Sequence, residues 1–319
     1  MYRFIILFSL IAVYLQSENR FKIEVPQNSE EYELIQSEMR KIDMDTVFES
    51  ASVTKSYPFL RNRVEVGKFL QLIDKEQGFY PEQQLIKVGK GGERCIVTYA
   101  SFNRNYADLI RSITKELESV GYNGYFYYRI GGYPTPTGVE AQYAAVPYAF
   151  KIFMMLEAAK LAGINNILWI DAALLPLRNP EPLFEKLNQD GHFLNVLYNA
   201  ESFQKAIPLS TRVLLTEYSG HDYLTQDKCH INMTVFGLCM DRPLAKNFLK
   251  SYYELVENGN AFISCLPEEY VISSIINQPK HRLTSEILSI PLMIRVREEN
   301  SQSIEKQRKK GYFFLSRSH

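Results

Sequence analysis

Cysteine is scarce in this sequence, and its spacing disfavours a common class of metal site. The chain of 319 residues has 4 cysteines, at positions 95, 229, 239 and 265, and none of them forms a Cys-x-x-Cys pair. This spacing argues against a structural zinc site. Cys95 and Cys239 stand inside apolar runs, which predicts buried and unreactive thiols. A disulfide between Cys229 and Cys265 stays open, because it depends on export to an oxidising compartment.

Net charge and several enzyme signatures are also missing. The 36 basic residues balance 36 acidic ones, so no overall field attracts nucleic acid or an anionic membrane. No G-x-S-x-G sequence occurs, which argues against an α/β hydrolase. The glycine- and proline-rich stretch 131–138 is no G-x-G-x-x-G fingerprint, so a dinucleotide cofactor is poorly supported; a lid or a static surface loop are the alternatives. Small, specific ligands are the expected partners.

Long apolar runs are confined to the N-terminus. Arg3 precedes a largely apolar run at 4–15 and polar residues at 16–18, which is the outline of a signal peptide. As a helix this run rises about 18 Å, short of the roughly 30 Å hydrocarbon core. An uncleaved signal anchor stays open because Leu15 is not small, and a buried N-terminal helix is a further alternative. We expect residues 1–20 to direct the chain to the secretory pathway or export, with a membrane contact only through this segment.

The next part of the chain favours helices. Apolar residues recur at helical spacing between positions 28 and 77, for example Tyr32, Ile35, Met39 and Ile42. The polar stretch 87–94 then interrupts the pattern. We therefore predict a helical N-terminal extension over 21–92 and one larger domain over 93–319.

The larger domain alternates between strands and helices. Apolar strands are predicted at 95–100, 125–130 and 166–170, with helices at 106–120 and 147–161 between them. This order predicts an α/β fold with a mostly parallel central sheet flanked by helices. Ligands of such folds lie beyond the carboxyl ends of the strands, so functional residues are expected just after Ala100, Ile130 and Ile170.

The most informative residue is Asp171. It directly follows the apolar strand, and Ala172 and Ala173 leave space beside it. A carboxylate in this place is suited to hold a divalent metal ion or a sugar hydroxyl. The alternative is an aspartate that only caps the following turn.

The segments around Asp171 carry a family resemblance. Pro-Tyr-Ala-Phe-Lys at 147–151, Leu-Trp-Ile-Asp-Ala at 168–172 and Pro-Leu-Arg-Asn-Pro at 176–180 resemble the nucleotide-diphospho-sugar transferases of the GT-A type, over about residues 94–279. The resemblance implies transfer of a sugar from a nucleotide-diphosphate donor to a hydroxyl of a glycan or other acceptor. In that family an Asp-x-Asp motif holds Mn²⁺ or Mg²⁺ on the donor phosphates. Here Ala173 replaces the second aspartate, so metal binding at Asp171 is left open.

The resemblance also implies several donor contacts. Thr98 and Tyr99 match the place where the first strand meets the nucleotide, and packing of Tyr99 over the sheet edge is the alternative. Lys151 and Arg178 are cations that could neutralise a phosphate, with simple solvent exposure as the alternative.

Two later segments match the acceptor side of the family. His230 and Asn232 begin a predicted strand at 230–238, followed by a helix at 243–258, and a structural histidine is the alternative there. Glu268 and Glu269 open a helix within 266–277, where the helix dipole alone would favour them. In an inverting enzyme one of them would take the acceptor's proton. His221 and Asp222 are further candidates for this base.

The missing second aspartate also supports a rival interpretation. A catalytically inactive relative that binds a glycan or a protein would tolerate Ala173. The charged stretch 295–310 and the aromatic residues after it predict a solvated helix followed by a closing strand or an aromatic cover.

Overall fold

The computed structural model describes most of the domain predicted over 93–319. The described residues are 81–100, 106–132, 134–135, 143, 146, 148–197, 209–220, 230–258, 260–262, 267–278, 292–295 and 301–317. The predicted signal segment 1–20, the helical pattern at 28–77, the cysteines Cys229 and Cys265, and the pair His221 and Asp222 lie outside these residues. Within the described part, no helix is long and apolar enough to cross a membrane.

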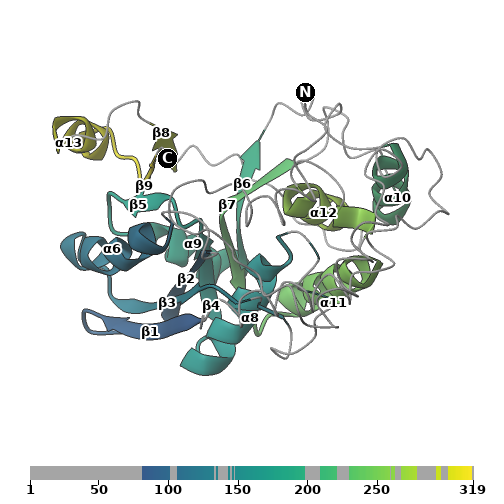
Figure 1. Ribbon diagram of the computed structural model, residues 1–319, viewed down its shortest axis with the longest axis horizontal. Helices are drawn as coiled ribbons and strands as arrows, with labels where there is room; N and C mark the ends of the chain where they lie inside the picture. The colour runs from purple at the N-terminus through teal and green to yellow at the C-terminus, as the bar shows by residue number, and fades with distance from the viewer. Residues whose placement is uncertain are drawn as a thin grey trace, which may run out of the picture.

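A six-stranded sheet forms the centre of the molecule, with strand order β1-β3-β2-β4-β7-β6 (Figure 1). The strands β2, β3 and β4 are parallel neighbours, as predicted. The strand β7 runs antiparallel to both β4 and β6, and β1 runs antiparallel to β3. The predicted α/β fold with helices on the sheet is confirmed. The strands of this sheet are β1 (Glu82–Val88), β2 (Arg94–Ala100), β3 (Gly124–Ile130), β4 (Asn166–Ile170), β6 (His192–Leu197) and β7 (His230–Cys239).

The strand β1 corrects one boundary. Its residues fall inside the range assigned to the helical extension, 21–92, yet they pair with β3 along their whole length. The polar stretch chosen as a boundary contains the turn between β1 and β2, where Gly89 has a φ of 56°. The glycine residues of this stretch form a turn inside the sheet and do not mark its start. A tight turn and a domain boundary both favour flexible, polar sequences, so the sequence does not distinguish them.

Helices cover both faces of the central sheet (Figure 1). Alternate residues of β2 enter two separate cores: Cys95 and Val97 pack on one face, and Ile96 and Ala100 on the other. Cys95 and Cys239 are buried free thiols, as predicted. The first face carries α8 (Phe150–Ala162), α10 (Leu209–Ser219), α11 (Pro243–Asn258), the short 3₁₀ helix η2 (Asn260–Phe262) and α12 (Pro267–Ile276). The second carries α6 (Tyr106–Ser119) and α9 (Glu181–Asp190).

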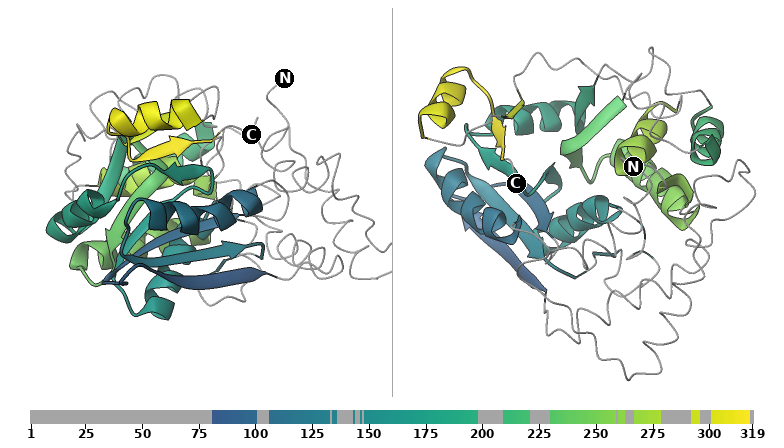
Figure 2. Two further views of the ribbon diagram at one scale, coloured as in Figure 1. Left: turned by 90° about the vertical axis from the view of Figure 1, so that its left-hand side faces the viewer. Right: turned by 45° about the horizontal axis from the view of Figure 1, so that its top comes forward.

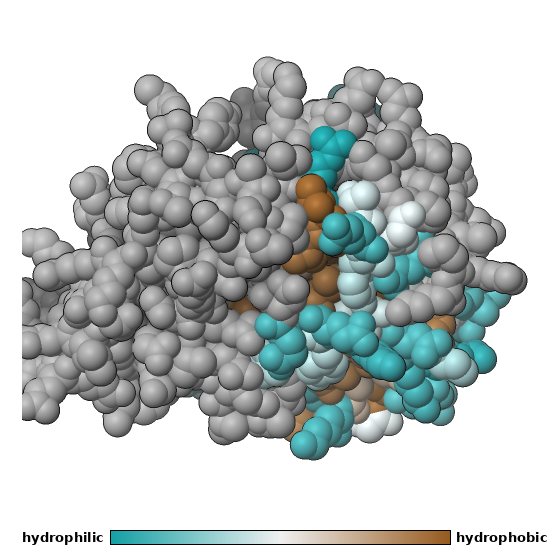
Figure 3. Space-filling view, turned by 90° about the vertical axis from the view of Figure 1, so that its right-hand side faces the viewer, coloured by the Kyte–Doolittle hydropathy of each residue, from teal (hydrophilic) through white to brown (hydrophobic). Residues whose placement is uncertain are grey.

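The side of the molecule on which α10, α11 and α12 lie shows a mixed surface. Its described residues form a narrow apolar strip bordered by hydrophilic side chains (Figure 3). Helix α11 has this character, because Phe248, Tyr252 and Leu255 are buried while Lys246 and Lys250 are exposed. The pattern is that of helices that turn one side to the core.

A small second sheet closes the other side of the molecule. The strand β9 (Phe314–Ser316) pairs antiparallel with β5 (Leu174–Pro176) and parallel with β8 (Met293–Arg295). Helix α13 (Ser301–Lys309) precedes β9, and both lie together at one edge of the molecule (Figure 2). The predicted solvated helix and closing strand are therefore confirmed. Since β5 follows Asp171 closely in sequence, the C-terminal segment is attached to the turn that begins at Asp171.

Candidate functional site

The ends of three parallel strands meet at one edge of the sheet. In the register of β2 and β4, Val97 lies opposite Trp169, and in that of β2 and β3, Ala100 lies opposite Ile130. Continuing the first register by two residues places Asp171 level with Tyr99. The prediction that Ala100, Ile130 and Ile170 end at a common edge is confirmed.

The side chain of Asp171 faces the α8 side of this edge. Its main-chain N–H donates to Thr234 on β7 at 2.9 Å, and its carbonyl accepts from Leu174 at 2.9 Å. The carboxylate Oδ1 accepts a hydrogen bond from Trp169 Nε1 at 2.9 Å. The turn after Asp171 is thus closed by a main-chain carbonyl, and the carboxylate, 32% exposed, is directed elsewhere.

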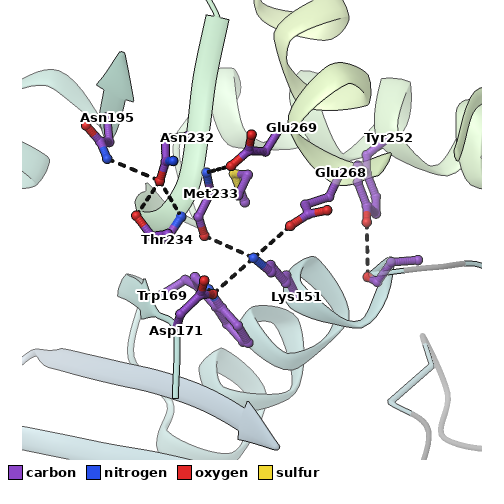
Figure 4. Close-up of polar contacts among 11 residues, drawn as sticks. Lys151, Trp169, Asp171, Asn195, Asn232, Met233, Thr234, Tyr252, Glu268 and Glu269 are labelled. Atoms are coloured by element: carbon purple, nitrogen blue, oxygen red, sulfur yellow. Dashed lines mark hydrogen bonds and ion pairs between the residues drawn. The ribbon is translucent and has the colours of Figure 1, made fainter. Parts of the chain in front are cut away.

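Lys151 is the centre of the site, and the alternative that it is solvent-exposed is wrong. The side chain is buried, with its Nζ 3.0 Å from Asp171 Oδ1 and 2.8 Å from Glu268 Oε1 (Figure 4). It also donates to the carbonyl of Met233 at 3.2 Å. The ring of Trp169 lies 5.6 Å from the Nζ, in cation–π range. We call Lys151, Asp171 and Glu268, with these contacts, the Lys151 cluster.

The two carboxylates of the Lys151 cluster keep the Lys151 ammonium protonated. Burial lowers the pKa of Lys151, but Asp171 and Glu268 raise it, and the net result lies well above the usual value. The ammonium therefore stays protonated. Burial raises the pKa of Glu268 above its usual 4.5, and the nearby Lys151 opposes this rise only in part. The ammonium shared with Asp171 does not fully compensate Glu268 for its lost hydration.

Helix α8 explains how a lysine comes to be buried here. Its first part, residues 150–156, has no polar residue other than Lys151, and Ile152, Phe153, Met154 and Met155 are all buried, so the lysine is buried together with them. The helix begins three residues after the predicted start, since Tyr148 has a φ of 60° and cannot be helical. The ring of Tyr148 is 45% exposed and its centroid lies 5.8 Å from Lys151 Nζ.

Glu268 and Glu269 both lie in the first turn of α12, as predicted, and both are buried. Glu269 Oε1 accepts a hydrogen bond from the N–H of Met233 at 3.2 Å. Met233 precedes Val235, which is the first residue of β7 that pairs with β4. Its main-chain groups are bound by Glu269 and Lys151 instead, as buried backbone groups require. The two glutamates thus fix both Lys151 and this part of β7.

The predicted residues at the start of β7 lie next to this region. Asn232 Oδ1 accepts from the N–H of Thr234 at 2.9 Å, from the Thr234 hydroxyl, and from Asn195 Nδ2 at 3.4 Å (Figure 4). It therefore shapes the strand around Met233. His230 begins β7 and pairs with Leu197 through the backbone; its side chain is outside the described residues.

Tyr99 lies beside the Lys151 cluster, whereas Thr98 and Arg178 do not. The Tyr99 hydroxyl donates to the Gly132 carbonyl at 2.7 Å, and its ring lies 4.4 Å from that of Phe150. Thr98 is fully buried on the opposite face of the sheet, among the α6-side core, and its hydroxyl has no hydrogen-bond partner in the described part of the chain. Arg178 donates to the Gly311 carbonyl at 2.7 Å and stacks on Phe313, so it anchors the C-terminal segment.

Three contributors were not predicted from the sequence. Trp169 shares the strand face of Asp171, and its position two residues earlier was a usable signal. The second is the Met233 carbonyl, a backbone group that no residue type reveals. Arg317 donates from Nη2 to the Ala172 carbonyl at 3.1 Å and from its main-chain N–H to the Ala173 carbonyl at 3.0 Å. It lies 145 positions from Ala172, so no local pattern links them.

Metal-ligating side chains do not gather in the described part of the chain. No group of three or more His, Cys, Asp or Glu side chains there could hold a metal ion. The carboxylates of the Lys151 cluster are engaged with an ammonium and with N–H donors.

Comparisons with known proteins return glycosyltransferase structures of low sequence identity. The apo structure of the bifunctional glycosyltransferase WbbM is 8% identical over 73% of this chain and 46% of its own, with a TM-score of 0.46. Mouse xyloside xylosyltransferase 1, in its apo form, is 11% identical over 70% of this chain and 97% of its own, with a TM-score of 0.40. The galactosyltransferase LgtC, solved with donor and acceptor sugar analogues, is 11% identical over 70% of this chain and 87% of its own, with a TM-score of 0.39. The sequence matches no protein-family model and no curated protein.

Proposed function

We propose that the chain is a glycosyltransferase that moves a sugar from a nucleotide-diphosphate donor to a hydroxyl acceptor, at the edge where β2, β3 and β4 end. The observation that carries the proposal is the Lys151 cluster, in which Asp171 and Glu268 reach one buried ammonium from separate elements. Charged groups with perturbed pKa values at the carboxyl edge of parallel strands are typical of functional sites. The sequence resemblance to GT-A transferases supplies the reaction class.

The reaction requires a carboxylate that substrates can reach. The acceptor oxygen forms a bond to the anomeric carbon, the bond from that carbon to the donor phosphate breaks, and the hydroxyl proton passes to a base. Among the carboxylates of the region, the Asp171 side chain is 32% exposed, whereas the Glu268 side chain is 7% exposed and Glu269 is buried. We assign substrate contact to Asp171. Glu268 and Glu269 are positioning residues, because they hold Lys151 and Met233.

Tyr148 offers a surface for the sugar or the base. Its ring is exposed beside the Lys151 cluster, and a tyrosine combines a flat apolar face with a hydroxyl. Its φ of 60° is unfavourable for a bulky residue, and such strain gathers at ligand sites. Together with Tyr99, it makes this edge of the sheet aromatic.

The test is release of nucleotide from a panel of nucleotide sugars by the full chain, with Asp171→Asn beside it. The amide keeps the shape but removes the charge, so turnover should fall about a hundredfold or more while the melting temperature changes little. Asp190→Asn is the matched control, since Asp190 forms an ion pair with Lys186 at 2.7 Å within helix α9. Equal turnover by Asp171→Asn and the wild type would remove Asp171 from the site.

A binding module is the second candidate, and Ala173 in place of an acidic residue favours it. Calorimetry with UDP and GDP separates the two proposals. Nucleotide binding together with turnover supports the transferase. A glycan or protein ligand bound without any nucleotide binding would support the module.

The route of the chain through the cell stays a proposal of its own. The apolar run at 4–15 motivates entry into the secretory pathway. A fusion of residues 1–20 to a reporter should be exported or membrane-associated, and a reporter that remains in the cytoplasm would contradict it.

A further inference from the structure

The oxygen atoms around Asp171 decide whether a divalent cation can bind there. Mg²⁺ takes about six oxygen ligands at roughly 2.1 Å, and Mn²⁺ likewise prefers carboxylate, carbonyl and water oxygens. A cation at Asp171 would therefore need the carboxylate and further protein oxygens with free lone pairs.

The inner carboxylate oxygen of Asp171 is already occupied. Oδ1 accepts from Trp169 Nε1 at 2.9 Å and lies 3.0 Å from Lys151 Nζ. A carboxylate oxygen has about two lone-pair positions, and two N–H donors fill them. Only Oδ2 remains for a further ligand.

The main-chain oxygens that follow also accept hydrogen bonds. The carbonyl of Asp171 accepts from Leu174, and the carbonyls of Ala172 and Ala173 accept from Arg317. The alanine side chains contribute no oxygen. Across the strand, the Met233 carbonyl accepts from Lys151. Each of these four carbonyl oxygens thus already accepts a hydrogen bond, and two of the donor residues are themselves cations.

Charge opposes a metal ion in the same place. The ammonium of Lys151 is only 5% exposed and lies in contact with the Asp171 carboxylate. A divalent ion on Oδ2 would stand a few ångströms from it with little water between them, where like charges repel strongly. Trp169 and Tyr148 place their rings around the same ammonium, which further favours a cation at the lysine position.

We propose that this site binds its nucleotide donor without a divalent cation, and that the Lys151 ammonium occupies the position beside Asp171 that a metal ion would otherwise take. The inference rests on the proposed function and departs from the Mn²⁺ or Mg²⁺ that the family resemblance implies. The described residues of the site do not fit the metal, because Oδ2 is the one oxygen of the Asp171 carboxylate without an N–H donor among them and because Lys151 already supplies the positive charge.

The first experiment needs no enzymatic activity and compares the wild type with Asp171→Asn. Electron paramagnetic resonance of free Mn²⁺ is measured while the full wild-type chain is titrated with the metal, first alone and then with UDP or GDP. No stoichiometric Mn²⁺ site should appear at millimolar metal. A stoichiometric site that is present in the wild type and lost in Asp171→Asn would overturn the proposal.

Two variants then test whether Lys151 is what excludes the metal. Ala173→Asp restores an Asp-x-Asp sequence but keeps the ammonium, and it should bind Mn²⁺ at least tenfold more weakly than Ala173→Asp combined with Lys151→Met. Equal Mn²⁺ affinity in the two variants would refute a role for Lys151. Should the double variant fold poorly, the wild-type titration still decides.

Calorimetry with nucleotide separates this inference from the proposed function. UDP or GDP should bind in EDTA within about twofold of its affinity in Mn²⁺. Binding that is tenfold weaker or absent in EDTA would overturn the inference and leave the transferase proposal standing. Absence of nucleotide binding under both conditions would overturn the transferase proposal, and the metal titration of the free chain would then decide the inference alone.

Discussion

Lys151→Met is the perturbation with the largest expected effect on stability. Methionine has a similar length and suits the apolar helix α8, so packing changes little. Loss of the ammonium, however, leaves Asp171 and the buried Glu268 without their shared partner. Breaking a buried ion pair from one side costs about 3–5 kcal/mol. For a domain of this size each kcal/mol lowers the melting temperature by about 2–4 °C, so a drop of roughly 6–20 °C is expected.

The control is a lysine of the same chemistry outside the core. Lys186 lies 2.7 Å from Asp190 one turn away on α9, and its side chain is 22% exposed, against 5% for Lys151. Such a pair contributes about 0.3–0.5 kcal/mol, so Lys186→Met should change the melting temperature by about 2 °C or less. Adding Glu268→Gln to Lys151→Met should recover part of the loss, since it removes an unpaired buried charge. Equal melting temperatures for Lys151→Met and Lys186→Met, by differential scanning calorimetry, would refute the buried cluster.

Three further changes test the surroundings of the site. The stability of Glu268→Gln relative to the wild type should increase as pH rises. The pKa of Glu268 is raised in the folded chain, so the folded chain binds the carboxyl proton more tightly than the unfolded chain does. The wild type therefore loses stability from about pH 4.5 upward, whereas the amide has no proton to lose. Urea unfolding at pH 4.5 and at about pH 7 measures the difference, and a constant difference contradicts it. Arg317→Met should cost about 2–4 kcal/mol in urea unfolding, because the carbonyls of Ala172 and Ala173 lose a charged donor. Thr98→Val should raise the unfolding free energy by about 1 kcal/mol, because the hydroxyl is buried without a partner in the described structure; a loss of stability would show that it is paired.

The sequence predicted the central fold well because its signals are local. The strands at 95–100, 125–130 and 166–170 are short apolar runs between turn residues, and helix α11 begins and ends at its predicted residues. The misplaced boundary near residue 92 has the opposite cause. In β1 only Glu82, Ile86 and Val88 are not exposed, so the strand has no clear apolar alternation that the sequence could reveal.

The site was predicted in position but not in its contacts. Asp171, Glu268 and Glu269 lie where strand polarity and helix starts placed them. Their partners come from elsewhere: Lys151 from α8, and Met233 from β7. Such contacts depend on how α8 and α12 pack on the sheet, which no spacing along the chain encodes.

The sequence around Lys151 carries a local signal for the burial of this lysine. It is the one charged residue in the run Phe-Lys-Ile-Phe-Met-Met-Leu at 150–156, which has no polar side to carry it into solvent. A lysine in such a helix must be buried, and a buried ammonium requires carboxylates within reach. Asp171 follows the neighbouring strand and is one such carboxylate. One ion pair with this aspartate does not offset the free energy that the ammonium loses when it leaves water. The burial of Lys151 therefore favours a second carboxylate from an element other than α8 and β4. Glu268 in the first turn of α12 is that carboxylate.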